Sequence, residues 1–196
     1  MDLREIKTER SIKEAFLTLR AKKPLERITV KELAEQAQIS KATFYLHYRD
    51  IYDLSAKMQG EVVREALEST DYPRLFLTEP IVFMKKLFQS CYTHKQVITI
   101  LFSDNQLSAL PAEVENTLKQ HLYEALPSSR HNLQINMVLT YMIQGAHHAF
   151  MNNINQYDIE ALLDAIGEYN VGVTSHLKQL VEEEIRKNGP IQGGPQ

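Results

Sequence analysis

Apolar residues recur along this chain of 196 residues at the three- and four-residue spacing of amphipathic helices. In the first such run, from Leu3 to about Ala21, Ile12, Phe16 and Leu19 fall on one helical face. No stretch alternates apolar and polar residues between turn residues, as a half-buried strand would, and no segment repeats. The pattern therefore predicts an all-α protein.

Residues 29–48 predict two short helices joined by a tight turn. Thr29 and Glu32 have the spacing of a capping box, in which the hydroxyl accepts from the third amide and the carboxylate reaches back to the cap amide. Ser40 is the predicted cap of the second helix. Such a pair forms a helix-turn-helix, whose second helix enters the major groove of DNA. An ordinary amphipathic helix pair is the alternative.

The second of these helices carries the groups that a DNA-binding helix needs. Phe44 and Tyr48 are four residues apart, so both are left for the core. Lys41 is expected to contact a guanine edge, with a phosphate contact as the alternative. The hydroxyl, cationic, aromatic and imidazole groups able to bind phosphates are Ser40, Lys41, Thr43, Tyr45 and His47.

Longer helices are predicted beyond residue 60. Two of them begin near Pro80 and Pro111, and the last two span about His131–Asn153 and Asp158–Lys187. The Gly- and Pro-rich end of the chain is predicted to be a flexible tail. These elements divide the chain into residues 1–60, with the helix-turn-helix at about 29–48, a larger helical domain at 61–188 and a tail at 189–196.

Charge is distributed unevenly between the parts of the chain. The formal net charge of the whole is −3, but residues 1–60 hold twelve Lys and Arg against nine Asp and Glu, a net charge of +3. The remaining residues hold ten bases and sixteen acids, a net charge of −6. This asymmetry is typical of a protein in which one module meets a polyanion, although chance variation of a few charges is the alternative.

Composition narrows the cellular setting. The single cysteine, Cys91, excludes an intrachain disulfide and fits a reducing compartment, and a small inert hydrophobe is favoured there over a redox sensor. No run reaches the roughly 18–20 apolar residues of a membrane span, and the charged amino terminus lacks the apolar region of a signal peptide. We therefore expect a soluble cytoplasmic protein without membrane contact.

The stretch from Ile28 to Leu54 resembles the DNA-binding region of the tetracycline-repressor (TetR) family. Its core Ser-Lys-Ala-Thr-Phe-Tyr-Leu-His-Tyr, at residues 40–48, and the Asp-Leu at 53–54 carry the resemblance, which covers about residues 4–60. The rest of the chain matches in helical layout and length alone. The resemblance implies a homodimer of two-domain, all-α subunits. Such a repressor binds a palindromic operator and releases it when a small-molecule effector binds.

The resemblance also implies which residues contact DNA. It places Lys41, Ala42 and Tyr45 against bases, and Leu46 with its neighbours near phosphate or sugar. Thr29 is placed at a helix cap that also touches phosphate, and Lys31 near the operator edge. The full set assigned to DNA binding is Thr29, Lys31, Ser40, Lys41, Ala42, Thr43, Tyr45, Leu46, His47 and Arg49.

Two positions depart from the family's usual pattern. Gln38 stands in the turn where the family usually has Gly, so we expect either a left-handed Gln or a different turn. Ile51 stands at the start of the fourth helix, where the family usually has a phosphate-binding Lys. Arg49 is the neighbouring cation that could supply this charge.

The region after residue 60 is expected to hold a ligand pocket and a dimer interface. A pocket between helices needs apolar walls with a few polar groups, and Met suits irregular shapes. Ordinary core packing is the alternative for each residue of both sets. The pocket residues are Met84, Phe88, Tyr92, Phe102, Met137, Tyr141 and Met142, and those of the dimer face, on the last two helices, are Gly145, Ala149, Leu162, Ile166, Val173 and Leu177.

No metal site, cofactor or catalytic constellation is predicted. His147 and His148 point about 100° apart on a helix, and no two His have the spacing of a helical metal pair. Phosphate-binding loops and nucleophile elbows are absent, which argues against an enzyme. Two alternatives to the effector-released repressor stay open. One is a ligand-independent or partner-dependent DNA-binding regulator or activator, and the other is an interaction dimer that uses the helix-turn-helix only as core.

Overall fold

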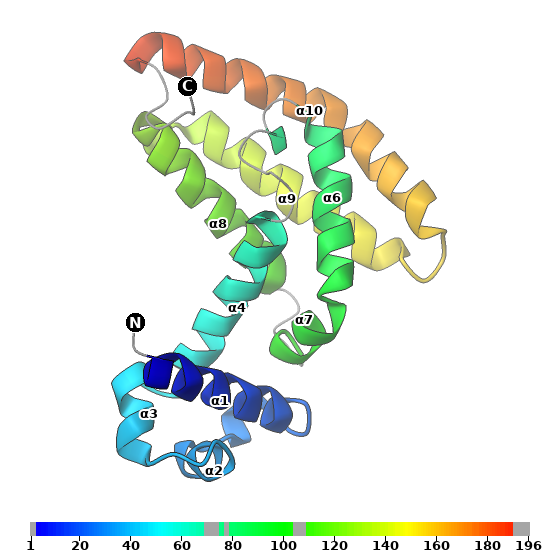
Figure 1. The fold of residues 1–196 in the computed structure, drawn as a ribbon. Coiled ribbons are helices and arrows are strands. Elements are labelled where there is room, and N and C mark those ends of the chain that lie inside the picture. Colours follow the sequence, from blue (N-terminus) through cyan, green and yellow to red (C-terminus); the bar gives the residue numbers. More distant parts are fainter. Residues whose placement is uncertain (1–2, 69–74, 77–78, 104–108, 190–196) are drawn as a thin grey trace. The chain divides into compact units, whose positions relative to one another are not determined.

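The regular structure of the chain is helical (Figure 1). This computed structural model describes residues 3–68, 75–76, 79–103 and 109–189, and within these ranges no strand occurs, which confirms the all-α prediction. Apart from Gly189, the predicted tail lies outside the described residues. The α-helices are α1 (Leu3–Arg20), α2 (Val30–Gln36), α3 (Lys41–His47), α4 (Ile51–Glu68), α6 (Pro80–Thr93), α7 (Lys95–Leu101), α8 (Ala109–Ala125), α9 (Leu133–Asn153) and α10 (Ile159–Asn188), with 3-10 turns at η1 (Leu25–Arg27) and η3 (Pro127–His131).

The long carboxy-terminal helices begin at side-chain caps. The Asn132 side chain accepts from the amide of Ile135 at the start of α9 (3.1 Å). Asp158 Oδ1 accepts from the amides of Glu160 (2.9 Å) and Ala161 (3.2 Å) at the start of α10. Both helices lie within two residues of the predicted boundaries, because polar caps satisfy amides that have no partner in the first turn.

The chain divides into two compact units. Unit 1 comprises Met1–Val62 and Thr93–Leu110, and unit 2 comprises Val63–Tyr92 and Pro111–Gln196. The division in the sequence near residue 60 is thus accompanied by a second segment that returns to the amino-terminal unit. That segment includes α7 and was not assigned to this unit from the sequence.

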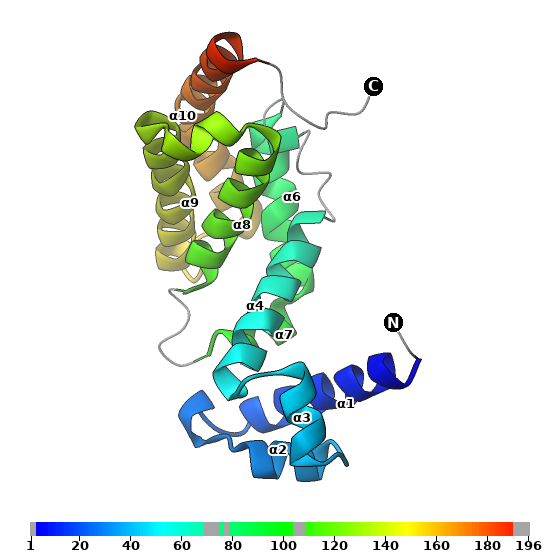
Figure 2. The same cartoon turned by 90° about the vertical axis from the view of Figure 1, so that its left-hand side faces the viewer.

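Unit 1 is built on the apolar faces that the sequence indicates. Ile12 and Phe16 are fully buried, and α1 contacts both α2 and α7 while α2 contacts α3 (Figure 2). Lys13 adds a polar connection, since its Nζ lies 2.8 Å from Glu9 Oε1 on α1 and 2.7 Å from Glu61 Oε2 on α4. Burial lowers the pKa of Lys13, but the two carboxylates outweigh burial and raise it.

The segment that contains α7 is held by apolar burial and by two carbonyl contacts. Leu101 and Phe102 are buried. Gln59 Nε2 on α4 donates to the carbonyl of Leu101 (2.9 Å), and the buried guanidinium of Arg20, at the end of α1, donates to the carbonyl of Ser103 (3.1 Å). These contacts explain why the segment groups with α1 and α4, because the carbonyls at the end of a helix need partners.

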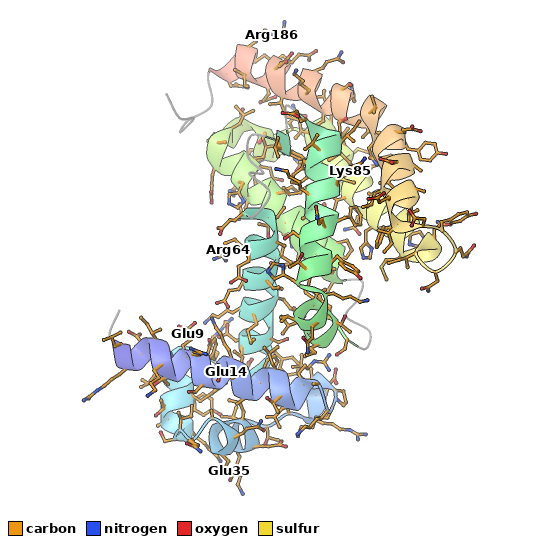
Figure 3. The ribbon with its side chains drawn as sticks, turned by 45° about the vertical axis from the view of Figure 1, so that its right-hand side comes forward. Glu9, Glu14, Glu35, Arg64, Lys85 and Arg186 are labelled. Carbon is orange, nitrogen blue, oxygen red and sulfur yellow. The ribbon has the colours of Figure 1, made fainter. Side chains whose placement is uncertain are left out.

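Unit 2 is centred on α9 and α10, which lie side by side (Figures 1 and 2). α10 also packs closely on α6: a methyl group built on Gly167 would lie 3.1 Å from Ile81 Cγ2, and Lys85 of α6 forms an ion pair with Asp164 (Figure 3). Phe88 of α6 stacks on Phe150 of α9 with ring centroids 4.5 Å apart. α10 therefore meets neighbours of its own chain on more than one side.

Candidate nucleic-acid interface

The first helix of the predicted helix-turn-helix begins at its expected cap. Thr29 Oγ1 accepts from the amide of Glu32 (3.3 Å), as the capping box requires. The carboxylate of Glu32 pairs with Lys23 Nζ instead of returning to the cap amide. Half of the box is formed, and the other half ties the start of α2 to the segment that follows α1.

The turn between α2 and α3 places Gln38 in the left-handed region, with φ 56°. The amide of Gln38 donates to the carbonyl of Glu35 (3.2 Å), and that of Ile39 donates to Ala34 (3.0 Å). These two bonds are those of a Schellman motif, which usually has Gly where this chain has Gln38. Of the two outcomes expected for this turn, the structure has the left-handed Gln.

Replacing Gln38 by glycine is expected to stabilise the protein. A side chain in the left-handed region costs about 1–2 kcal/mol, and glycine removes this cost but adds entropy to the unfolded chain. We expect a net gain of about 0.5–1 kcal/mol in the free energy of unfolding, measured by urea denaturation. Gln38→Ala, which keeps a Cβ, is the matched control and should give no such gain; equal effects of the two variants would contradict this account of the turn.

The second helix, α3, is capped and anchored as predicted. Ser40 Oγ accepts from the amide of Thr43 (3.0 Å) and lies 2.8 Å from Thr43 Oγ1. Phe44 is fully buried and Tyr48 is buried, with ring centroids 5.8 Å apart. Burial, followed by the charge of Glu9, raises the pKa of Tyr48 to about 12. One face of α3 is thereby fixed against unit 1, and the opposite face is left outside.

The outward face of α3 presents most of the residues assigned to DNA binding. Tyr45 is 57% exposed and Leu46 is 84% exposed. Lys41 and Ala42 are exposed, and no carboxylate among the described residues pairs with Lys41. Of the whole assigned set, Thr43 and His47 are half-buried, and Thr29, Lys31, Ser40, Lys41, Ala42, Tyr45, Leu46 and Arg49 are exposed.

The junction of α3 and α4 is organised by one carboxylate. Asp53 accepts from the amide of Arg49 (3.0 Å) and from its guanidinium (2.9 Å), and its other contact is Lys57 Nζ at 3.1 Å. The bonds from the Arg49 amide and guanidinium, with Lys57, hold the pKa of Asp53 at about 2, so the carboxylate stays charged at neutral pH. Ile51 is buried and cannot contact phosphate. Arg49 is the exposed cation at this position, and a phosphate would compete with Asp53 for it.

Lys57 is a residue of this region that the sequence analysis did not single out. Its Nζ donates to the carbonyl of His47 at the end of α3 (3.3 Å) and lies 4.9 Å from the centroid of the Tyr48 ring. A cation at a helix carboxy terminus satisfies a free carbonyl and interacts favourably with the helix dipole. Arg49, Asp53 and Lys57 are spaced four residues apart, and this spacing could have predicted the two ion pairs of Asp53 from the sequence.

Comparison with known proteins bears on residues 14–58, which match the family of bacterial regulatory proteins called the tetR family. The match spans α2, the left-handed turn and α3, and it ends in α4. Residues 14–58 are a tetR-type segment. This segment supports a DNA-binding transcription regulator.

The chain was also compared with solved structures and with curated protein sequences. A solved crystal structure of a candidate transcription regulator from Lactobacillus plantarum is similar to the regulator with 16% sequence identity and a TM-score of 0.47, over 82% of this chain and 96% of that chain. No curated protein sequence matches the chain.

The residues assigned to a ligand pocket belong to both units of the chain. In unit 2, Met84 and Met142 are buried and Phe88 is half-buried. Phe102 is buried in unit 1, next to α7. The other three assigned residues lie on the surface of the chain, and they are Tyr92, Met137 and Tyr141.

The residues assigned to the dimer face also fall into two groups. Gly145 and Ala149 of α9 are exposed. Leu162, Ile166 and Leu177 of α10 are buried inside the single chain, and Val173 is half-buried. Because α10 packs on both α9 and α6, the three buried side chains belong to the core of the chain itself.

Further structural findings concern sites outside the interface. Within the part of the chain that the structure describes, no three His, Cys, Asp or Glu side chains gather as they would around a metal ion. Burial, followed by the neighbouring His148, lowers the pKa of His147, and burial raises that of Cys91 to about 11. Among the same residues, none of the helices combines the length and apolar character needed to cross a membrane.

Proposed function

We propose that the regulator acts as a homodimer on a palindromic operator, with α3 of each subunit in the major groove. The observation that carries this proposal is the outer side of α3, where the cation of Lys41 and the aromatic ring of Tyr45 are exposed while the ring of Phe44 is fully buried. A recognition helix needs such a fixed inner face and a free outer face. The net charge of +3 over residues 1–60 supports contact with a polyanion.

Selection of bound fragments from random duplex DNA tests this proposal. We expect an enriched palindrome whose half-sites lie about 10–10.5 base pairs apart, or a multiple of this spacing, because a two-fold dimer repeats its recognition helix once per subunit. Binding to the selected duplex should weaken linearly in log affinity against log salt concentration. Recovery of no common sequence, or of unpaired single sites, would contradict the proposal.

An exposed apolar stripe on α9 supports the dimer. Leu133, Met137 and Tyr141 are 71%, 63% and 71% exposed, and the small exposed residues Gly145 and Ala149 continue the same four-residue spacing. These five residues, the α9 stripe, form a row that turns by about 40° per step around the helix, so neighbouring members share a face and the row winds along α9. Small residues let a partner helix approach closely, and a second copy of the stripe would cover the apolar side chains.

The effector part of the proposal rests on linkage. A small molecule releases the operator only if it binds the DNA-incompetent arrangement more tightly than the competent one. A thermal-shift screen against small metabolites, followed by operator titration with each stabilising compound, measures this directly. A stabiliser that weakens operator binding is the expected result. Operator binding that no stabiliser affects would favour the ligand-independent regulator.

The role of Lys41 is tested on variants of the selected operator. We assign Lys41 to a guanine edge. Lys41→Ala should therefore lose about 1–3 kcal/mol of binding free energy on the best operator, and much less on an operator altered at the base pair that Lys41 contacts. Lys31→Ala is the control for a cation at the operator edge, and it should weaken all operators alike and lower the salt slope by about one. An equal loss of binding free energy on all operators would mean that Lys41 contacts phosphate and not a base.

A further inference from the structure

The middle of the outward face of α3 is apolar. Ala42 and Leu46 lie two residues before and after Phe44, so each is within about 20° of the direction opposite that buried ring. Leu46 is 84% exposed, the largest exposed fraction among the large apolar side chains of the described residues, and Ala42 is also exposed.

Polar groups frame this apolar centre on both sides. Lys41 and Tyr45 occupy one flank of the helix, and Thr43 and His47 occupy the other. A single exposed leucine is ordinary on a protein surface. Here, however, two apolar side chains four residues apart occupy the part of the helix that would lie deepest in a groove, and polar side chains flank them on both sides.

The chemistry of the major groove offers one partner for such a centre. Each base pair presents hydrogen-bond donors and acceptors there, and the C5-methyl group of thymine is the apolar group among them. The short side chain of Ala42 lets the helix backbone approach the bases, and the longer side chain of Leu46 reaches one turn further along the groove.

We propose that Ala42 and Leu46 select thymine in each half-site by packing on its C5-methyl group. This inference rests on the proposed function, because it requires α3 to lie in the major groove of duplex DNA. The exposed cations Lys31 and Arg49 of unit 1 are available to the phosphate backbone beside the apolar contact.

Removal of the methyl group alone tests the inference. In the selected operator, each thymine is replaced in turn by deoxyuridine, which keeps base pairing, and the dissociation constant is measured for the wild type and for Leu46→Ala. At the thymine under Leu46 we expect the wild type to weaken about fourfold per half-site, and about tenfold or more when both half-sites are changed. Leu46→Ala should bind the two forms within about a factor of 1.5 of each other. Ala42→Gly applies the same comparison to a second thymine.

The matched control is Leu3→Ala, which removes an equally exposed leucine from α1 and should keep the full response to the methyl group. A second pair of operators carries cytosine or 5-methylcytosine at the position of this thymine. The wild type should bind the 5-methylcytosine operator more tightly than the cytosine operator, and Leu46→Ala should bind both equally. The inference would be overturned if no thymine-to-deoxyuridine change alters the dissociation constant of the wild type, or if Leu46→Ala loses as much affinity as the wild type on removal of the methyl group. Either result would leave the proposed function intact. Failure to recover any operator would overturn both.

Discussion

Replacing Phe44 by alanine is expected to cost about 3–5 kcal/mol of the free energy of unfolding, the largest effect we expect on stability. The ring is fully buried and lies 5.5 Å from the ring of Tyr45 in an edge-on arrangement and 5.8 Å from that of Tyr48. Its removal leaves a cavity under a helix of only seven residues, which has little stability of its own. Since a domain is stable by about 5–15 kcal/mol, a large fraction of the protein should lose α3.

Urea denaturation followed by circular dichroism measures the effect, with Leu46→Ala as the matched control. Leu46 lies two residues further along the same helix and is exposed, so its replacement should change the free energy of unfolding by no more than about 0.5 kcal/mol. The pair separates the inner face of α3 from the outer face. Equal costs for the two variants would mean that α3 is not anchored through Phe44.

Replacing Tyr141 by aspartate is expected to dissociate the proposed dimer and to weaken operator binding more than a hundredfold. Tyr141 lies in the middle of the α9 stripe and is exposed in the single chain. In a two-fold interface the substitution occurs twice, and each copy would place an unpaired carboxylate in an apolar contact. A monomer then binds one half-site without the avidity of the linked second one, which is worth about 10²–10⁴.

Sedimentation velocity and operator titration on the same preparation measure both consequences. Tyr157→Asp is the matched control, because Tyr157 is also well exposed but lies between α9 and α10 and is not part of the stripe. It should leave the dimer and operator affinity unchanged. A Tyr141→Asp protein that remains dimeric would exclude the α9 stripe as the interface.

Local features of the helix-turn-helix were predictable from the sequence because they depend on neighbouring residues. The cap at Ser40 and the inward pair Phe44 and Tyr48 follow from hydroxyl chemistry and from helical spacing. The left-handed Gln38 follows from a turn geometry that normally requires glycine.

Other features depend on which distant segment of the chain packs on a given helix face, and the local sequence pattern does not identify that segment. The apolar side chains of Leu162 and Ile166 are real signals of burial, but the sequence does not say that α9 and α6 of the same chain cover α10. Likewise, nothing near Leu101 indicates that its carbonyl accepts from Gln59 in unit 1. Exposed apolar side chains occur on α9 instead, at residues such as Met137 that sequence reasoning assigned to a pocket.

The insertion of α3 into the major groove is tested most directly by dimethyl sulfate protection of the selected operator. This reagent methylates guanine N7 in the major groove and adenine N3 in the minor groove, so one experiment reports on both grooves. We predict protection of guanine N7 in two patches related by two-fold symmetry and about one helical turn apart, with loss of one protected guanine per half-site in Lys41→Ala. Protection confined to adenine N3 would contradict this account of α3. So would a protection pattern that neither Lys41→Ala nor Tyr45→Ala changes.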